Sequence, residues 1–191
     1  PGMPDVSLEL ADLLAKHRLK PVATLLTHGH LDHTFSVAPI CDGYGIPAYI
    51  HSEDRNLLLN PAAAVSPEFA ATLGAMTFVE PKEVKELKSG EEFELVGLKI
   101  KAIHSPGHTR GSLMFLVDDE TLVSGDVLFA GSIGRTDLPT GSSDDMMKTL
   151  IKKVLPLRDE IRVLPGHHQE TKIGIERKNN PYLLEAARAS R

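Results

Sequence analysis

The chain has 191 residues, of which 41% are hydrophobic and 25% charged, and its formal net charge is −5. This is enough apolar material for one sizeable core, so we expect a single domain over residues 1–191. No run of lysine and arginine stands out and no apolar run approaches the length of a membrane span, which argues against nucleic acid and membranes as partners. No signal peptide opens the sequence, which favours the cytoplasm, and the oligomeric state is left open.

The first half of the chain alternates helical and strand-like segments. A helix is predicted over residues 7–17 and a strand over 22–26. A second helix is expected over 33–42, followed by a strand over 47–50. Residues 52–59 look helical, with Ser52 as the expected N-cap, although His51 is also a candidate to cap this turn.

Residues 60–81 carry three prolines and an alanine-rich middle. We predict an irregular or helical insertion near the mouth of the functional site. Phe69, Met76 and Phe78 are candidates to line a substrate pocket, but core packing is the favoured prediction for these side chains.

The second half of the chain is richer in strands. We expect strands over residues 93–96, 98–103, 113–117, 121–124 and 161–163. A helix is expected to start at Ser142 or Ser143 and to run through Val154. The tail 174–189 is predicted to be helical and broken at Pro181. The single cysteine, Cys41, lies in an apolar stretch and is expected to be a small core residue.

The most informative segment is Thr-His-Gly-His-Leu-Asp-His over residues 27–33, directly after a predicted strand. If this segment stays extended, side chains two apart point the same way, so His28, His30 and Asp32 would share one face. Asp32 and His33 are adjacent and would diverge. One loop could therefore supply ligands to two metal ions.

Three further strand-like segments each end in a glycine turn with one ligand-type residue. These residues are His108, Asp126 and His167. Imidazole and carboxylate ligands suit zinc, and also iron or manganese, so the residues do not fix the metal. The other histidines are expected to be structural: His17 faces solvent and His104 supports the loop before His108.

Four motifs occur in the order T-H-G-H-L-D-H, S-P-G-H-T-x-G-S, S-G-D and P-G-H. In this respect the chain resembles the metallo-β-lactamase superfamily, and within it the glyoxalase II-like hydrolases. The resemblance extends from the first residues to about Leu183. It implies a mixed α/β fold, an αββα sandwich with the metals at one edge between two sheets.

The resemblance also implies a two-metal site in which Asp126 bridges the ions. The first ion would be held by His28, His30 and His108, and the second by Asp32, His33 and His167. Two metal ions, most simply zinc, would share a hydroxide that attacks a thioester such as S-lactoylglutathione or a related acyl-thiol. Asp32 would have a catalytic task as well, accepting a hydrogen bond from the nucleophile.

Two features bear on the substrate, which is expected to be a small molecule. Glyoxalase II enzymes grip glutathione with a helical domain and with a lysine and a tyrosine after the bridging aspartate. This chain has only a short tail after His167, and it has Gly-Ser-Ile-Gly-Arg-Thr-Asp over residues 131–137. Arg135 is a candidate to meet a substrate carboxylate, whereas pairing of Arg135 with Asp137 is the structural alternative.

Other activities on the same scaffold stay open. Persulfide dioxygenases use one iron, and they share the Gly-Arg-Thr-Asp stretch of residues 134–137. They usually carry His-Asp-Tyr at the last ligand turn, where this chain has His-His-Gln over residues 167–169. A metallohydrolase of lactones or esters is the other alternative.

The beginning of the sequence carries one more expectation. Relatives place two or three strands before the first helix, ending in an Asp-Pro-Gly turn. This sequence starts at Pro1-Gly2, as if inside that turn. We therefore expect a sandwich that lacks the first N-terminal strands, completed by a longer gene product or by a neighbouring chain.

Overall fold

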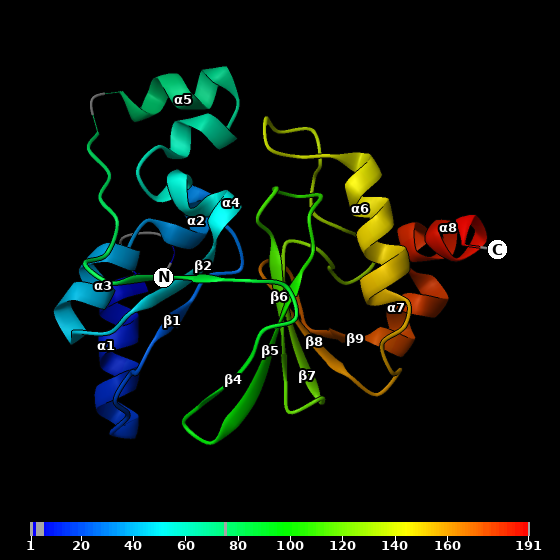
Figure 1. Cartoon of the computed structure of the whole chain (residues 1–191), viewed down its shortest axis with the longest axis horizontal. Helices are drawn as coiled ribbons and strands as arrows, with labels where there is room; N and C mark the ends of the chain where they lie inside the picture. Colours follow the sequence, from blue (N-terminus) through cyan, green and yellow to red (C-terminus); the bar gives the residue numbers. More distant parts are fainter. Residues whose placement is uncertain (1, 3–5, 75, 191) are drawn as a thin grey trace.

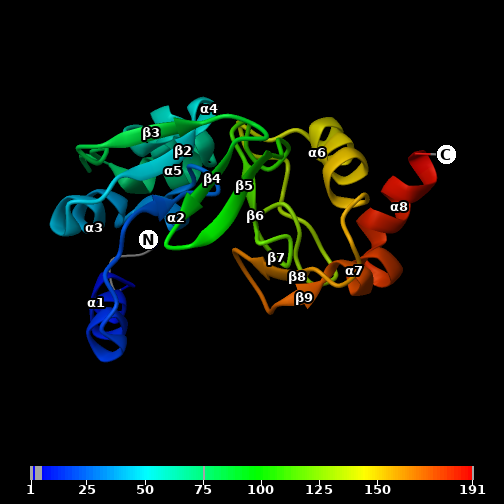
Figure 2. The ribbon, with the colours of Figure 1, turned by 60° about the horizontal axis from the view of Figure 1, so that its bottom comes forward.

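The computed structural model describes residue 2, residues 6–74 and residues 76–190. Two sheets are formed by these residues (Figures 1 and 2). The first is a three-stranded parallel sheet in the order β1-β2-β3, and its strands are Thr24–Leu25, Ala48–His51 and Val84–Leu87. Parallel neighbours need crossover connections, and helical segments fill both of them.

The second sheet has six strands in the order β4-β5-β6-β7-β8-β9 among the described residues. Its pairs are antiparallel except for β7 and β8, which run parallel. The strands are Glu92–Leu95, Leu98–His104, Leu113–Val117, Thr121–Gly125, Arg162–Pro165 and Thr171–Lys172.

The helices fall into two sets along the chain, one before β3 and the other after β7. The first set comprises α1 (Val6–His17), α2 (Leu31–Thr34), α3 (Val37–Tyr44), α4 (Ser52–Arg55), two 3₁₀ turns (Asn56–Leu58 and Pro61–Ala64) and α5 (Pro67–Leu73). The second set comprises α6 (Ser143–Thr149), its π-helical continuation Leu150–Val154, α7 (Ile173–Asn179) and α8 (Pro181–Ala189).

Three apolar clusters define the order of the layers. Side chains of α3 pack on one face of the first sheet, where Val37 and Cys41 meet Ala48 and Ile50. The other face of the first sheet packs against the second sheet. At this interface Tyr49 stacks on Phe93 with ring centroids 5.7 Å apart.

Helices α6 and α8 lie beside the second sheet, on the side away from the first (Figure 1). The third cluster packs between these helices and that outer face of the sheet. In β6, Met114 and Leu116 face this cluster, whereas Leu113 and Phe115 face the first sheet. Alternate side chains of a strand point to opposite faces, so one buried strand serves two cores. The layers are therefore helix, sheet, sheet, helix, as expected for an αββα sandwich.

Most predicted elements are confirmed within a few residues, including α1, the hairpin of β4 and β5, and the helical break at Pro181. Four details differ. The helix predicted over 33–42 is two helices, α2 and α3. Ser52 is not the cap of α4, whereas the other candidate, His51, is confirmed, because its side chain accepts a hydrogen bond from the Glu53 amide at 3.3 Å. The strands β3 and β9 were not predicted.

The part of the chain that the structure describes contains no helix with the length and apolarity required to cross a bilayer.

Candidate metal centre

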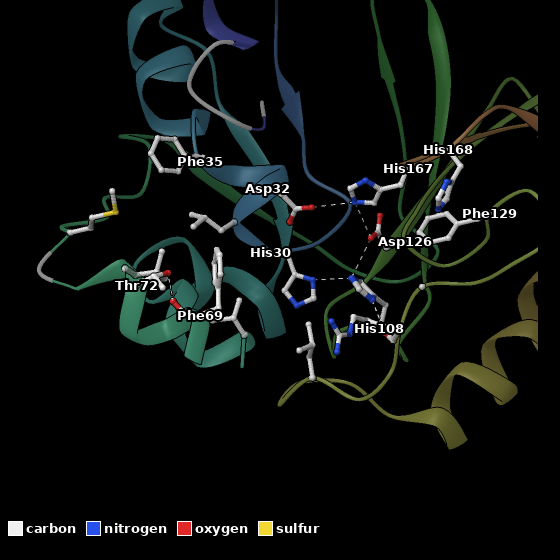
Figure 3. Close-up of a pocket in the computed structure, with 17 residues that line it drawn as sticks. His30, Asp32, Phe35, Phe69, Thr72, His108, Asp126, Phe129, His167 and His168 are labelled. Carbon is white, nitrogen blue, oxygen red and sulfur yellow. Dashed lines mark hydrogen bonds and ion pairs between the residues drawn. The ribbon is translucent and has the colours of Figure 1, made fainter. Parts of the chain in front are cut away.

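The turns that follow β1, β5, β7 and β8 meet at one edge of the sandwich, and the candidate ligands lie on them. His28 and His30 lie between β1 and α2, and His108 lies between β5 and β6. Asp126 follows β7 and His167 follows β8. Figure 3 shows His30, His108, Asp126, His167 and Asp32 converging on one region from these separate elements.

The first group of candidate ligands is His28, His30 and His108, whose ligand atoms lie within 4.8 Å of one another. All three side chains are buried. The Nδ1 of His30 is 2.8 Å from the Nε2 of His108. Neutral imidazoles held this close, with ring nitrogens converging, are suited to a divalent cation.

The second group is Asp32, His33 and His167. The Nε2 of His167 lies 3.1 Å from Oδ2 of Asp32, and the Nε2 of His33 lies 3.4 Å from the same oxygen. Asp32 and His167 are about half exposed, so this group is open to the solvent.

The expectation that Asp32 shares a face with His28 and His30, and diverges from His33, is wrong. The extended backbone ends at His30, which has φ −65° and ψ 148°, and α2 begins at Leu31. The rotation per residue is then helical, which carries Asp32 to the side of His33. Spacing alone did not show where the strand geometry stops.

Asp126 lies between the two groups. Its Oδ2 is 3.5 Å from Nε2 of His108 and 3.4 Å from Nε2 of His167, and its Oδ1 is 3.4 Å from Nε2 of His33. The carboxylate is 8% exposed. It therefore contacts a member of each group, which is the position required of a bridging ligand.

The hydrogen bonds behind the imidazoles turn their free nitrogens toward the centre. The Nδ1 of His108 is 2.8 Å from the backbone oxygen of Arg135, which can only accept, so Nδ1 carries the proton and Nε2 is left as the ligand atom. Nδ1 of His28 is 3.1 Å from the Thr27 hydroxyl. Nε2 of His28 and Oδ1 of Asp126 are buried without a hydrogen-bond partner among the described residues. Such atoms are costly unless a cation satisfies them, so the donor set fits metal ions.

Burial lowers the pKa of each of the three imidazoles of the first group. Burial, followed by the neighbouring His33 and His108, lowers the pKa of His28. Burial lowers the pKa of His30 to about 4. The hydrogen bond to His33 lowers the pKa of Asp32, despite an opposing effect of burial. At neutral pH His28 and His30 are therefore neutral and Asp32 is ionised, which are the ligand forms of these groups.

Close approach of the backbone explains the glycine in the Pro-Gly-His turn. A Cβ added to Gly166 would lie 2.2 Å from Oδ1 of Asp126 and 2.8 Å from Cε1 of His33. Any side chain at residue 166 would displace one of these two groups. The turn brings His167 in against Asp126 because it has no side chain there.

Asp54 is a buried residue beside the candidate site that sequence reasoning missed. Its carboxylate is fully buried and accepts hydrogen bonds from the Gly29 amide at 2.9 Å, the Gly111 amide at 2.7 Å and the Thr109 hydroxyl at 2.6 Å. The first donor lies between His28 and His30, and the last is adjacent to His108. Asp54 therefore joins the two loops that carry the first group, although it contacts none of the ligands itself. The signal in the sequence, an acid early in a helix, has the ordinary meaning of a helix-dipole charge.

Replacement of Asp54 by asparagine is expected to lower the affinity for metal by about 10- to 100-fold, because the amide cannot accept from three donors and the ligand loops lose their common anchor. Chelator competition measures this affinity directly. Asp42→Asn is the matched control, since Asp42 is an exposed acid that accepts one backbone hydrogen bond, from Lys82 at 2.9 Å. Equal affinities of the two variants would contradict the anchoring role.

The remaining histidines take supporting positions. His51 and His104 stack with ring centroids 3.9 Å apart, and Nε2 of His104 is 2.7 Å from the backbone oxygen of Arg110. His17 is exposed, as predicted. His168 has a positive φ of 67° and lies against Phe129 at the rim of the site.

A pocket of about 640 Å³ opens beside the candidate ligands (Figure 3). Arg135 lines it, and its guanidinium donates from Nε and Nη2 to the two oxygens of Asp137, both at 2.8 Å. Phe69 and Met76 also line it and are 49% and 58% exposed, so the prediction that they pack in a core is wrong. Phe78 is partly buried and contacts Phe35 edge to face.

Comparison with known sequences agrees with this geometry. Residues 1–167 match the Metallo-beta-lactamase superfamily. The uncharacterized protein Rv2581c of Mycobacterium tuberculosis is 43% identical over 181 residues, which cover 91% of this chain and 81% of that protein. The probable metallo-hydrolase YqgX of Bacillus subtilis is 35% identical, covering 86% and 77%. The hydroxyacylglutathione hydrolase GloC of Haemophilus influenzae is 34% identical, covering 83% and 74%.

Solved structures share the fold. The BLEG-1 B3 metallo-beta-lactamase superposes with a TM-score of 0.83 and 34% identity, covering 96% of this chain and 86% of that one. TTHA1623, in a di-iron-bound form, superposes with a TM-score of 0.78 and 35% identity, covering 96% and 87%.

Proposed function

Because this chain belongs to the metallo-beta-lactamase superfamily, a superfamily of metal-dependent hydrolases, we propose that it is a dinuclear hydrolase of thioesters. The observation that carries the proposal is the position of Asp126 between two complete groups of candidate ligands. Two ions would use both groups, whereas one ion held by the first group would leave Asp32, His33 and His167 without a metal.

Each residue of the centre has a task that its surroundings support. His28, His30 and His108 would hold one metal ion and Asp32, His33 and His167 the other, with Asp126 shared. When bound, the two ions supply Lewis acidity that lowers the pKa of water and draws electrons from a carbonyl group. Asp32 is half exposed at the pocket and ionised, so its free oxygen can accept a hydrogen bond from the attacking water and orient it.

The surroundings of Arg135 favour acyl-thiols in general over strict dependence on glutathione. Arg135 is a cation at the rim of the pocket, and its bidentate pair with Asp137 occupies the fork that would grip a substrate carboxylate. A glutathione carboxylate would have to compete with Asp137. S-Lactoylglutathione is therefore proposed as a substrate that is cleaved with weak saturation.

The similarity to GloC supports thioesters as the substrate class, because that relative is named a hydroxyacylglutathione hydrolase. We propose zinc as the metal on the basis of the imidazole-rich ligand set. The di-iron form of TTHA1623 supports iron as the alternative on the same ligands.

The proposal predicts close to two metal ions per chain in protein purified without chelator, and hydrolysis of S-lactoylglutathione by that protein. Elemental analysis gives the metal count, and thiol release gives the rate. The same preparation should be assayed with a chromogenic β-lactam and, by oxygen uptake, with glutathione persulfide.

A single iron together with oxygen uptake would replace the proposal by a persulfide dioxygenase. Turnover of the β-lactam without turnover of any thioester would place the activity with the beta-lactamases that share the fold. Either result would contradict a thioester hydrolase.

A further inference from the structure

The wall of the pocket opposite the candidate ligands is apolar. It is formed by Phe35, just after α2, and by Val65, Phe69, Leu73 and Met76 from the segment around α5. Figure 3 shows Phe35 and Phe69 on the far side of His30 and Asp32 from Phe129. The pocket thus has a polar end at the ligands and an apolar end at α5.

Two large side chains at the apolar end, those of Phe69 and Met76, are exposed and do not belong to the buried core. Phe69 is 49% exposed and Met76 58% exposed, and both point into the same cavity. Large apolar side chains gathered around a cavity beside a reactive centre indicate a binding site, because their exposed apolar surface faces water unless a ligand covers it.

We propose that this end of the pocket binds the acyl group of the substrate, and that the enzyme prefers thioesters with an apolar acyl chain of several carbons. This inference rests on the proposed thioesterase function. In the reaction, the water oxygen bonds to the acyl carbon and the carbon–sulfur bond breaks. One proton of the water goes to the departing thiolate, and the carboxylic acid product releases the other to the solvent. The carbonyl carbon of the substrate must lie at the candidate ligands, so its acyl chain can extend toward α5 before and after the carbon–sulfur bond breaks.

The lining assigns this end to the acyl chain rather than to the thiol carrier. Thiol carriers are peptides or nucleotides with charged groups. Among the described residues, no charged side chain belongs to the apolar wall formed by Phe35 and the segment around α5. The Thr72 hydroxyl also lines the pocket, but it donates to the backbone oxygen of Phe69 at 2.7 Å. Arg135, the cation of the lining, is paired with Asp137.

The test is a series of S-acyl-N-acetylcysteamines from acetyl to octanoyl, assayed with the metal-loaded protein. We expect kcat/KM to rise by about fourfold for each methylene until the pocket is filled. A value of kcat/KM that does not change with the length of the acyl chain, or that falls with it, would overturn the inference while leaving thioester hydrolysis intact.

Variants of Phe69 and Met76 test whether these side chains contact the acyl chain. Phe69→Ala and Met76→Ala are each expected to lower the ratio of hexanoyl to acetyl turnover by about tenfold. Tyr182→Ala is the matched control, because Tyr182 is a large side chain on α8 with 41% exposure that does not line the pocket. An unchanged ratio in both pocket variants would assign the chain-length effect to some other surface.

A binding measurement separates failure of this inference from failure of the proposed function. If no thioester is cleaved, the function is wrong, and calorimetry with acetate, butyrate, hexanoate and octanoate still tests the pocket. Tighter binding of the longer carboxylates, lost in Phe69→Ala, would support an apolar acyl site for another class of acyl substrate. Binding independent of chain length would overturn it.

Discussion

Replacement of Asp126 by alanine is expected to remove metal and activity together. The carboxylate contacts His108 of the first group and both His33 and His167 of the second, so its loss affects both ions at once. The loss of metal affinity should exceed the roughly 10- to 100-fold that follows removal of an outer residue such as Asp54. Elemental analysis and thioester turnover on the same preparation measure the two effects.

Asp32→Asn provides the comparison for this variant. Asp32 belongs to the second group alone, so the variant should keep the first ion and lose less metal than Asp126→Ala. Activity should still fall, because the amide cannot replace the ionised carboxylate that orients water. Near-normal metal content in Asp126→Ala would refute the bridging role.

The metal-free protein is expected to lose stability as the pH falls from about 6.5 to about 4. Burial holds the pKa of His30 at about 4, whereas the unfolded chain binds this proton near 6.5. Acidification through this window therefore favours the unfolded state, and His30 alone should cost about 3 kcal/mol at pH 4. His28 and His108 act in the same direction, because burial lowers the pKa of each.

Urea unfolding at fixed pH values between 7 and 4 measures this effect. His30→Asn should flatten the dependence, and His17→Gln, which changes an exposed imidazole, should preserve it. The lowered pKa of Asp32 acts in a different window, since that stability is lost only below its ordinary value of 3.8. A constant free energy of unfolding between pH 7 and 4.5 would contradict the burial of neutral histidines.

The sequence predicted the elements of the fold well where periodicity was strong and local. The strands of the second sheet alternate or run as buried apolar segments, and their glycine turns bring His108, Asp126 and His167 to one edge. β9 is two residues long and β3 has an exposed middle, so neither offers a clear pattern. Their place depends on pairing with a neighbouring strand.

The spacing of residues in the sequence does not determine how the side chains of the candidate site are grouped in space. Residue types identified the ligand-type side chains, but the switch from strand to helix after His30 decides how Asp32 is grouped. Asp54 was missed because its three donors come from loops distant in the sequence. Phe69 and Met76 were assigned to a core because apolar residue type does not distinguish a core from a pocket wall.

The distribution of the ligands along the chain separates the two groups in the order of synthesis. His28, His30 and His108 are all present once β5 and the turn after it have been synthesised, whereas His33 and His167 are 134 residues apart in sequence. A ribosome synthesises the chain from its N-terminal end, so every side chain of the first group precedes the last side chain of the second. A chain interrupted between Asp126 and His167 would therefore carry the complete first group and Asp126, but it would lack the last candidate ligand of the second group.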